Sequence, residues 1–260
     1  MKIGVFDSGL GGLTVVRSML KLLHGAEIFY IADTHYAPYG EKLFSKILQR
    51  SLILTQYLID HYNIQALVVA CNTATSAAIK ELRQRYPELI IIGTEPAVKP
   101  AIEQTKTGAI GVMATPATLK GDKYQSLVDR VASDKAVTLY EQACAGLVEH
   151  IEHNTLDSYE SQQLLEHWLK PMREGGVDII VLGCTHYPLA GTEIKKILNR
   201  EVTLIDSGDA IAHHLLHQLQ ARGHANQGEL GVHVFHTGEI DTDLVDRILK
   251  RDYILQRIEV

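Results

Sequence analysis

The sequence predicts an α/β protein made of two similar doubly wound lobes, each built on a parallel sheet. Along the 260 residues, short apolar runs alternate with longer amphipathic runs. Several of the short runs are continuous in Ile, Val and Leu, which is typical of parallel strands that helices cover on both faces. Polar motifs that follow apolar runs in the first half have counterparts in the second half. Together these observations indicate repeated strand–helix units around parallel sheets.

The individual elements follow from these patterns. The strands are predicted at Ile3–Phe6, Ile28–Ile31, Ala66–Ala70, Leu89–Ile92, Ala109–Met113, Val137–Tyr140, Val177–Leu182, Val202–Ile205 and Val232–Phe235. Between them, apolar residues that recur at helical spacing along one broad face predict helices at Leu43–Tyr62, Ala74–Arg85, Tyr159–Lys170 and Ala210–Ala221.

A weak internal duplication predicts the domain organisation. The segment Val68–Thr73 has a partner in Val181–His186, and Val5–Gly9 has one in Val112–Pro116. In each pair an apolar run passes into a polar turn, and the order and spacing are similar. We therefore expect a first lobe formed by residues 1–96 and 208–260, and a second formed by residues 97–207.

The composition excludes several classes of function. The net charge is −6, and no cluster of Lys and Arg marks a nucleic-acid surface. No stretch approaches the roughly 18 apolar residues of a membrane span, and the apolar run that follows Lys2 is too short for the one that a signal peptide needs. We therefore expect a cytoplasmic protein that binds neither nucleic acid nor membrane. In that compartment its three cysteines would not form structural disulfides.

Four polar motifs stand where predicted strands end. Ligands of open parallel sheets bind outside the carboxyl ends of the strands, where helix N-termini favour anions. We therefore expect the ligand-binding residues among these motifs, which are Asp7-Ser8-Gly9, Cys71-Asn72-Thr73, Thr115-Pro116-Ala117-Thr118 and Cys184-Thr185-His186.

Two of these motifs begin with cysteine. A helix N-terminus lowers the pKa of a thiol and so favours the reactive thiolate. A single cysteine at a strand end is more often a small buried apolar residue. Cys71 and Cys184 stand in matched polar contexts, however, which favours a chemical role for both. Cys144 has no comparable polar neighbours and is interpreted as structural.

Other uses of these residue types are less well supported. There is no C-x-x-C or H-E-x-x-H motif, and the helical set Asp209, His213 and His217 is interpreted as a solvated face rather than a metal site. The glycines near residue 10 do not complete a dinucleotide fingerprint, because position 14 is Thr. No P-loop and no G-x-S-x-G elbow is present.

Four strings carry a family resemblance that extends over essentially the whole chain. The sequence resembles the glutamate racemases of the aspartate/glutamate racemase superfamily. The matching strings are FDSGLGGL at Phe6–Leu13, APYG at Ala37–Gly40, ACNTA at Ala70–Ala74 and GCTHYP at Gly183–Pro188.

The resemblance implies an isomerase with its active site in the cleft between the two lobes. Such an enzyme interconverts L- and D-glutamate without cofactor or metal and supplies D-glutamate for peptidoglycan. By motif position, Cys71 resembles the base for the D-enantiomer and Cys184 the base for the L-enantiomer. Asp7 resembles the acidic partner near the first thiol, and His186 resembles the partner of the second. Glu149 resembles a further catalytic carboxylate of the family, with Glu152 as the alternative. The implied substrate-binding residues are Asp7, Ser8, Tyr39, Gly40, Asn72, Thr73, Thr115, Thr118, Thr185 and His186.

Two alternatives to a glutamate racemase stay open from the sequence. One is an aspartate racemase, or a racemase of another amino acid, within the same superfamily. The other is a non-catalytic binding or inhibitory protein on the same fold, against which the intact pair Cys71 and Cys184 argues. Because family members are often dimers, the resemblance is compatible with a homodimer.

Overall fold

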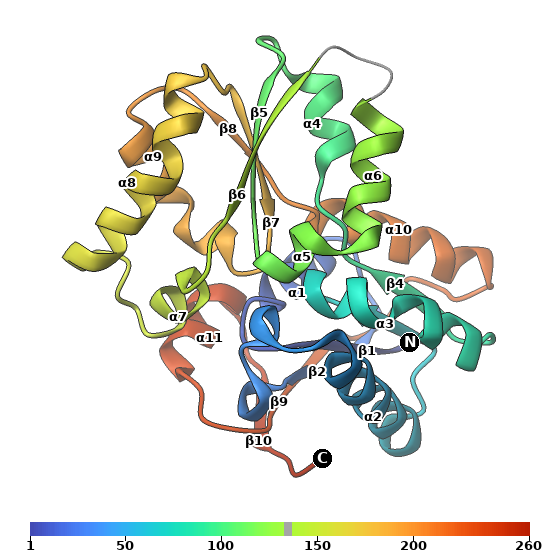
Figure 1. Ribbon diagram of the computed structural model, residues 1–260. Helices are drawn as coiled ribbons and strands as arrows, with labels where there is room; N and C mark the ends of the chain where they lie inside the picture. Colours follow the sequence, from blue (N-terminus) through green and yellow to red (C-terminus); the bar gives the residue numbers. More distant parts are fainter. Residues whose placement is uncertain (133–136) are drawn as a thin grey trace. The chain divides into compact units, whose positions relative to one another are not determined.

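The structure is a computed structural model that describes residues 1–132 and 137–260 (Figure 1). The chain divides into two compact units. Unit 1 comprises Met1–Thr94 and Gly208–Val260, and unit 2 comprises Glu95–Ser207. Each unit contains its own sheet with helices packed against it, and the two are described separately below.

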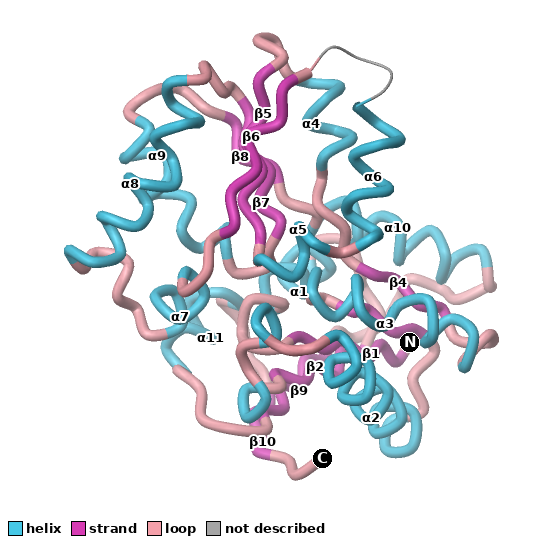
Figure 2. Tube along the Cα trace, in the orientation of Figure 1, coloured by secondary structure: helices cyan, strands magenta, loops and turns pink. Residues whose placement is uncertain are grey.

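Unit 1 is built on a six-stranded parallel sheet. Figure 2 shows the strands of the protein in magenta. Its strand order is β10-β9-β2-β1-β3-β4. The strands are β1 (Lys2–Asp7), β2 (Glu27–Ala32), β3 (Ala66–Val69), β4 (Ile90–Gly93), β9 (Gly231–His236) and β10 (Ile254–Arg257).

Unit 2 contains a four-stranded parallel sheet in the order β6-β5-β7-β8. These strands are β5 (Ala109–Ala114), β6 (Thr138–Ala143), β7 (Ile179–Gly183) and β8 (Thr203–Ile205). Their order repeats that of β2-β1-β3-β4 in unit 1. In both units the chain passes from the first strand to a neighbour on one side and then places the next strand on the other side. Each sheet therefore has a topological switch point, between β1 and β3 in unit 1 and between β5 and β7 in unit 2.

Helices cover both faces of the unit 1 sheet. Phe6 and Val69 face a core shared with α2 (Phe44–Tyr62) and α3 (Asn72–Arg85). Successive strand side chains point to opposite faces, and Val5 and Val68, which point the other way, are also fully buried. The remaining helices of this unit, which pack together, are α1 (Leu13–Leu20), α10 (Gly208–Ala221) and α11 (Thr242–Leu249).

Unit 2 has one apolar cluster on each face of its sheet. Met113 and Leu182 belong to the first cluster, with α7 (Leu147–Glu152), α8 (Tyr159–Glu174) and α9 (Gly191–Leu198). Val112 and Val181 belong to the second, with α4 (Val98–Gln104) and α6 (Asp122–Ala132). The short helix α5 (Pro116–Lys120) directly follows β5. Burial on both faces explains why these strands read as unbroken apolar runs.

The structure confirms the predicted α/β class with two parallel sheets. The predicted strands and the four predicted helices are all present, most of them within about two residues of their expected bounds. Strand β6 extends three residues beyond the predicted Tyr140, and α8 extends four residues beyond the predicted Lys170. Strand β10 was not predicted, because all four of its residues are exposed and leave no apolar pattern. Among the described residues, no helix has the length and apolar character needed to cross a membrane.

Candidate active site

The switch point of unit 1 brings together two of the predicted motifs. Asp7 is the last residue of β1, and Cys71 follows the neighbouring strand β3. The Cys71 Sγ lies 3.9 Å from the Ser8 Oγ, so the thiol and the hydroxyl are direct neighbours. The pair therefore occupies the place where open α/β sheets bind their ligands.

The backbone of α3 holds the Cys71 thiol. Cys71 is the N-cap of this helix in extended conformation, and its Sγ accepts a hydrogen bond from the Ala74 backbone N–H at 3.4 Å. A helix N-terminus stabilises a thiolate over a thiol, because the helix dipole and the free N–H groups favour negative charge. Only 6% of Cys71 is exposed. This environment suits a base that acts on a bound molecule rather than on solvent.

Asn72 and Thr73 form the first turn of α3 and are buried beside the thiol. Within the described part of the chain, the buried Nδ2 of Asn72 has no hydrogen-bond partner. Burying a polar group without a partner costs free energy, and such a group at a strand end is a donor available to a ligand oxygen. This supports the predicted substrate-binding role of Asn72.

Asp7 fixes the turn that follows β1. It is fully buried, and its Oδ2 accepts a hydrogen bond from the Gly12 backbone N–H at 2.6 Å. A Cβ at position 12 would lie 2.7 Å from the Asp7 Cβ, so this close approach requires glycine. Asp7 therefore has a structural role in the loop that carries Ser8, and this role is compatible with proton transfer.

Tyr39 and Gly40 begin a 3₁₀ turn, Tyr39–Glu41, which packs against α3. Tyr39 is buried in the core cluster that also contains Cys71. Burial, and then the charges of Asp33 and Cys71, raise the pKa of its hydroxyl far above the usual range. The hydroxyl thus stays protonated and donates a hydrogen bond to the Asp33 carboxylate. Sequence reasoning missed Asp33.

The switch point of unit 2 carries the other two motifs. Thr115 follows β5 and is the N-cap of α5. Its Oγ1 accepts a hydrogen bond from the Thr118 backbone N–H at 3.2 Å and lies 2.9 Å from the Thr118 Oγ1. Cys184 and the buried Thr185 follow the neighbouring strand β7. The four residues are thus presented at adjacent strand ends.

Cys184 belongs to a chain of three polar side chains. Its Sγ lies 3.9 Å from the Nδ1 of His186, and the Nε2 of His186 lies 2.6 Å from the Oε1 of Glu152. Burial lowers the pKa of His186, but hydrogen bonds from the ring to Cys184 and Glu152 raise it, and the net pKa is well above the usual value. A protonated His186 beside Cys184 can deliver a proton to the sulfur.

The carboxylate that reaches His186 is Glu152. The resemblance implied a further catalytic carboxylate at Glu149, with Glu152 as its alternative, and both residues lie on α7. The charge of Glu149 instead contributes to raising the pKa of Tyr187, behind burial and the charges of Cys184 and Cys144. The geometry thus favours Glu152 as the partner of His186.

The third cysteine has a different environment. Cys144 is 2% exposed in the apolar cluster of unit 2, and its thiol donates to the Gln142 carbonyl oxygen at 3.5 Å. Burial, and next the charge of Cys184, raise the pKa of this thiol well above its usual range. A thiol held in its neutral form inside apolar packing is inert, which agrees with the structural role expected for Cys144.

No candidate metal centre was found where residues are described, since no three His, Cys, Asp or Glu side chains there are arranged to hold an ion. His213 and His217 lie exposed on α10. Asp209 on the same helix forms an exposed ion pair with Lys21. These residues occupy a solvated face, as the sequence pattern indicated.

The fold, with polar and thiol groups at the switch points of parallel sheets, defines a doubly wound α/β enzyme. Comparison with known protein families identifies the family of this chain. Residues 3–215 match the family described as Asp/Glu/Hydantoin racemase, and the chain belongs to this family.

Individual relatives agree with this assignment. A glutamate racemase of Aliarcobacter butzleri is 57% identical over 98% of this chain and 97% of its own. A glutamate racemase of a Sulfurovum species is 56% identical over 96% of this chain and 94% of its own. Among solved structures, a glutamate racemase isoform from Bacillus anthracis has a TM-score of 0.87 and 31% identity, covering 99% of this chain and 97% of that one.

An Escherichia coli glutamate racemase solved with L-glutamate and the activator UDP-MurNAc-ala is also similar. Its TM-score is 0.84 at 30% identity, and the match covers 99% of this chain and 97% of that one.

Proposed function

We propose that this protein is a glutamate racemase that moves the α-proton of glutamate between two cysteines, Cys71 and Cys184. The main support is that each parallel sheet ends, at its switch point, in a cysteine with polar neighbours. The names of the relatives supply the substrate, because those 56% and 57% identical over nearly the whole chain are glutamate racemases.

Racemisation must break the bond between Cα and its hydrogen on one face and form a new bond on the other. In the proposed reaction a thiolate takes the α-proton and becomes a thiol. The electron pair stays on the substrate as a carbanion, which the opposite thiol then protonates from the other face. That thiol becomes a thiolate, so protons and charge balance over one turnover. Two fixed groups can do this without either one having to move around the substrate.

The local environments fit a division of labour between the two thiols. Following the resemblance, Cys71 acts on D-glutamate and Cys184 acts on L-glutamate. The N-terminus of α3 stabilises the Cys71 thiolate, whereas His186 and Glu152 tune Cys184. Asp7 is proposed as the acidic partner near Cys71. Ser8, Asn72, Thr73, Thr115, Thr118 and Thr185 would bind the carboxylates and stabilise the carbanion.

We further propose that the reaction needs neither a cofactor nor a metal. We also propose that it takes place in the cytoplasm and supplies D-glutamate for peptidoglycan. The E. coli relative was solved with UDP-MurNAc-ala as its activator, which supports a link to cell-wall precursors. On this proposal, treatment with a chelator or with hydroxylamine, which traps carbonyl cofactors, leaves turnover unchanged. A loss of turnover with either reagent would contradict this part of the proposal.

The first experiment follows the circular dichroism of L-glutamate and of D-glutamate with the purified protein. Both signals should decay to zero, and L-aspartate should change much more slowly. Faster racemisation of aspartate would assign the protein to the aspartate racemases instead. A folded protein that binds glutamate and racemises neither amino acid would be a non-catalytic member of the fold.

The second experiment tests the two bases separately in deuterated water. Cys71→Ser should still let deuterium enter L-glutamate through Cys184 while forming little D-glutamate. Cys184→Ser should show the opposite preference, with exchange into D-glutamate. Cys144→Ser is the matched control and should racemise as the parent does. Equal exchange into both enantiomers in each variant would contradict the two-base mechanism.

A further inference from the structure

A buried network in unit 1 converges on Asp33. The fully buried carboxylate accepts hydrogen bonds from Arg50 at 2.8 Å to Oδ2 and 2.7 Å to Oδ1. Its Oδ2 also accepts the Tyr39 hydroxyl at 2.5 Å, and its Oδ1 accepts the Thr237 hydroxyl at 3.0 Å. Both oxygens thus accept two hydrogen bonds each, which matches the capacity of a carboxylate. Asp33 therefore has no remaining acceptor site for a substrate proton.

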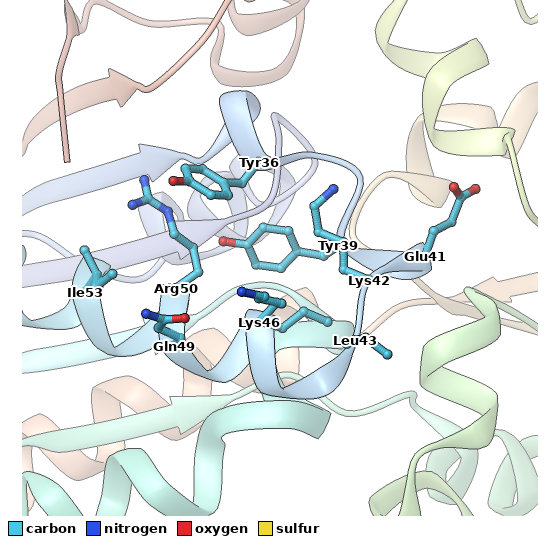
Figure 3. A pocket seen from close by; sticks show the side chains of 10 residues that line it. Tyr36, Tyr39, Glu41, Lys42, Leu43, Lys46, Gln49, Arg50 and Ile53 are labelled. Atoms are coloured by element: carbon cyan, nitrogen blue, oxygen red, sulfur yellow. The ribbon is translucent and has the colours of Figure 1, made fainter.

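Arg50 connects this carboxylate to two further segments. Its side chain is 5% exposed, and its Nη1 donates to the main-chain oxygen of Val260 at 2.6 Å. Its guanidinium lies 4.2 Å from the centre of the Tyr36 ring. Figure 3 shows Arg50 beside the Tyr36 ring and the Tyr39 hydroxyl. One cation thus ties α2, the Tyr36–Tyr39 segment and the C-terminus together.

The network is expensive to bury. Removing a charge from water costs several kcal/mol, and an ion pair recovers this cost only with near-ideal geometry and satisfied hydrogen bonds. Apolar side chains could fill the same space at lower cost. Stability alone therefore does not explain why a buried ion pair is present here. Because Asp33 contacts Tyr39 directly, we looked to the position of Tyr39 for its role.

We infer that Asp33 and Arg50 are positioning residues that hold the Tyr39–Gly40 turn in its substrate-binding place beside Cys71. This inference rests on the proposed function, which places Tyr39 and Gly40 among the groups that bind glutamate. The turn packs on α3, the helix that Cys71 caps, and Tyr39 shares a core cluster with that cysteine. Because the turn is short and irregular, the anchored Tyr39 side chain sets its position.

The test compares conservative substitutions that weaken the anchor by different routes. Tyr39→Phe removes the hydroxyl that meets Asp33, and Arg50→Lys keeps the charge but loses the two-pronged hydrogen bond. Each should raise the KM for glutamate about tenfold, the equivalent of one hydrogen bond to a charged group, while kcat falls less than about threefold. The KM for glutamate of the Tyr39→Phe/Asp33→Asn double variant should be close to that of Asp33→Asn alone. Both substitutions act on the same hydrogen bond between Tyr39 and Asp33, so their effects should not add.

The control is Arg83→Lys, which changes another arginine of unit 1. Arg83 donates to the Ile91 carbonyl oxygen and is not part of the Asp33 network. Its substitution should leave the KM for glutamate unchanged. The melting temperatures of all variants show whether a variant has lost folded protein. Such a loss lowers the apparent kcat at constant KM, whereas a displaced Tyr39–Gly40 turn raises the KM.

A cavity beside Arg50 allows chemical rescue. Its volume is about 600 Å³, and Arg50, Tyr36 and Tyr39 are among the residues that line it. Ethylguanidinium added to Arg50→Ala should therefore reach the Asp33 carboxylate and lower the raised KM. Where Arg50→Ala does not fold, Tyr39→Phe and Arg50→Lys still decide the question.

Binding of D-glutamate, measured by calorimetry on the same proteins, separates this inference from the proposed function. Absence of racemisation by the parent protein would defeat the proposed function, and the dissociation constants would then test the positioning role. Parent-like KM and dissociation constants in folded Tyr39→Phe and Arg50→Lys would overturn the inference, even with an active parent enzyme.

Discussion

Replacing Glu152 by Gln tests the polar chain that extends from Cys184. Gln keeps the size of the side chain and can still hydrogen-bond to His186, but it carries no charge. His186 is 1% exposed and its Nε2 lies 2.6 Å from the Glu152 Oε1, so this carboxylate, together with Cys184, favours the protonated ring. A hydrogen bond to a charged group contributes about 1.5–3 kcal/mol. Without the charge of Glu152, fewer interactions oppose the effect of burial, and the pKa of His186 falls from its raised value although the contact with Cys184 remains.

This change has a defined dependence on pH. The partners of His186 raise its pKa in the folded protein despite burial. A raised pKa contributes stability that is fully present below the unfolded value of about 6.5 and is lost as the pH rises through the folded value. Glu152→Gln should therefore destabilise the protein most near about pH 5.5, by roughly 1.5–3 kcal/mol. The difference from the parent should shrink in alkaline solution.

The assays are urea unfolding at several pH values, NMR titration of the His186 ring and racemisation of both enantiomers. Turnover should fall about 100-fold, in the range of general acid–base catalysis. Glu149→Gln, on the same helix, is the matched control and should change turnover less than about threefold. An unchanged His186 titration in Glu152→Gln, or a larger loss in Glu149→Gln, would refute the reasoning.

Three further substitutions test other parts of the structure. Cys144→Ser should leave turnover within about threefold of the parent, and the parent Cys144 should react slowly with iodoacetamide in peptide mapping, because its thiol is buried and neutral. Gly12→Ala should lower the free energy of unfolding by about 1–3 kcal/mol in urea titrations, because the new Cβ would crowd Asp7. Lys21→Ala should change that free energy by less than about 1 kcal/mol, because its ion pair with Asp209 is exposed to solvent.

The sequence was most informative where burial imposes a pattern. The strand Val177–Leu182 was predicted from its unbroken apolar residues, and the structure has β7 at Ile179–Gly183 with every residue buried. Strand β10 could not be predicted in this way. It pairs with β9 through backbone hydrogen bonds, and its side chains are all exposed, so burial imposes no apolar pattern on them.

The candidate site was predictable only in part. The sequence placed His186 two residues from Cys184, and the structure shows the contact. It could not decide between Glu149 and Glu152, because the choice depends on how α7 is rotated against its unit. Arg50 gave no signal either, since its partners lie far from it in sequence and a charged residue within a helix is usually exposed.

Four strands of the unit 1 sheet have the same order as the unit 2 sheet, but the surroundings of the two thiols differ, with a helix N-terminus at Cys71 and a histidine–carboxylate pair at Cys184. Enantiomers have equal free energies in water, so the equilibrium constant of the proposed reaction is one whatever the catalyst. By the Haldane relation, the ratio kcat/KM must therefore be the same in both directions. If the two thiols differ in reactivity, kcat and KM can each differ between the two directions. They must then differ by the same factor, so that kcat/KM stays equal. An enzyme whose two thiols differ would be saturated by one enantiomer at a lower concentration than by the other. It would nevertheless convert a dilute solution of either enantiomer to an equal mixture of both.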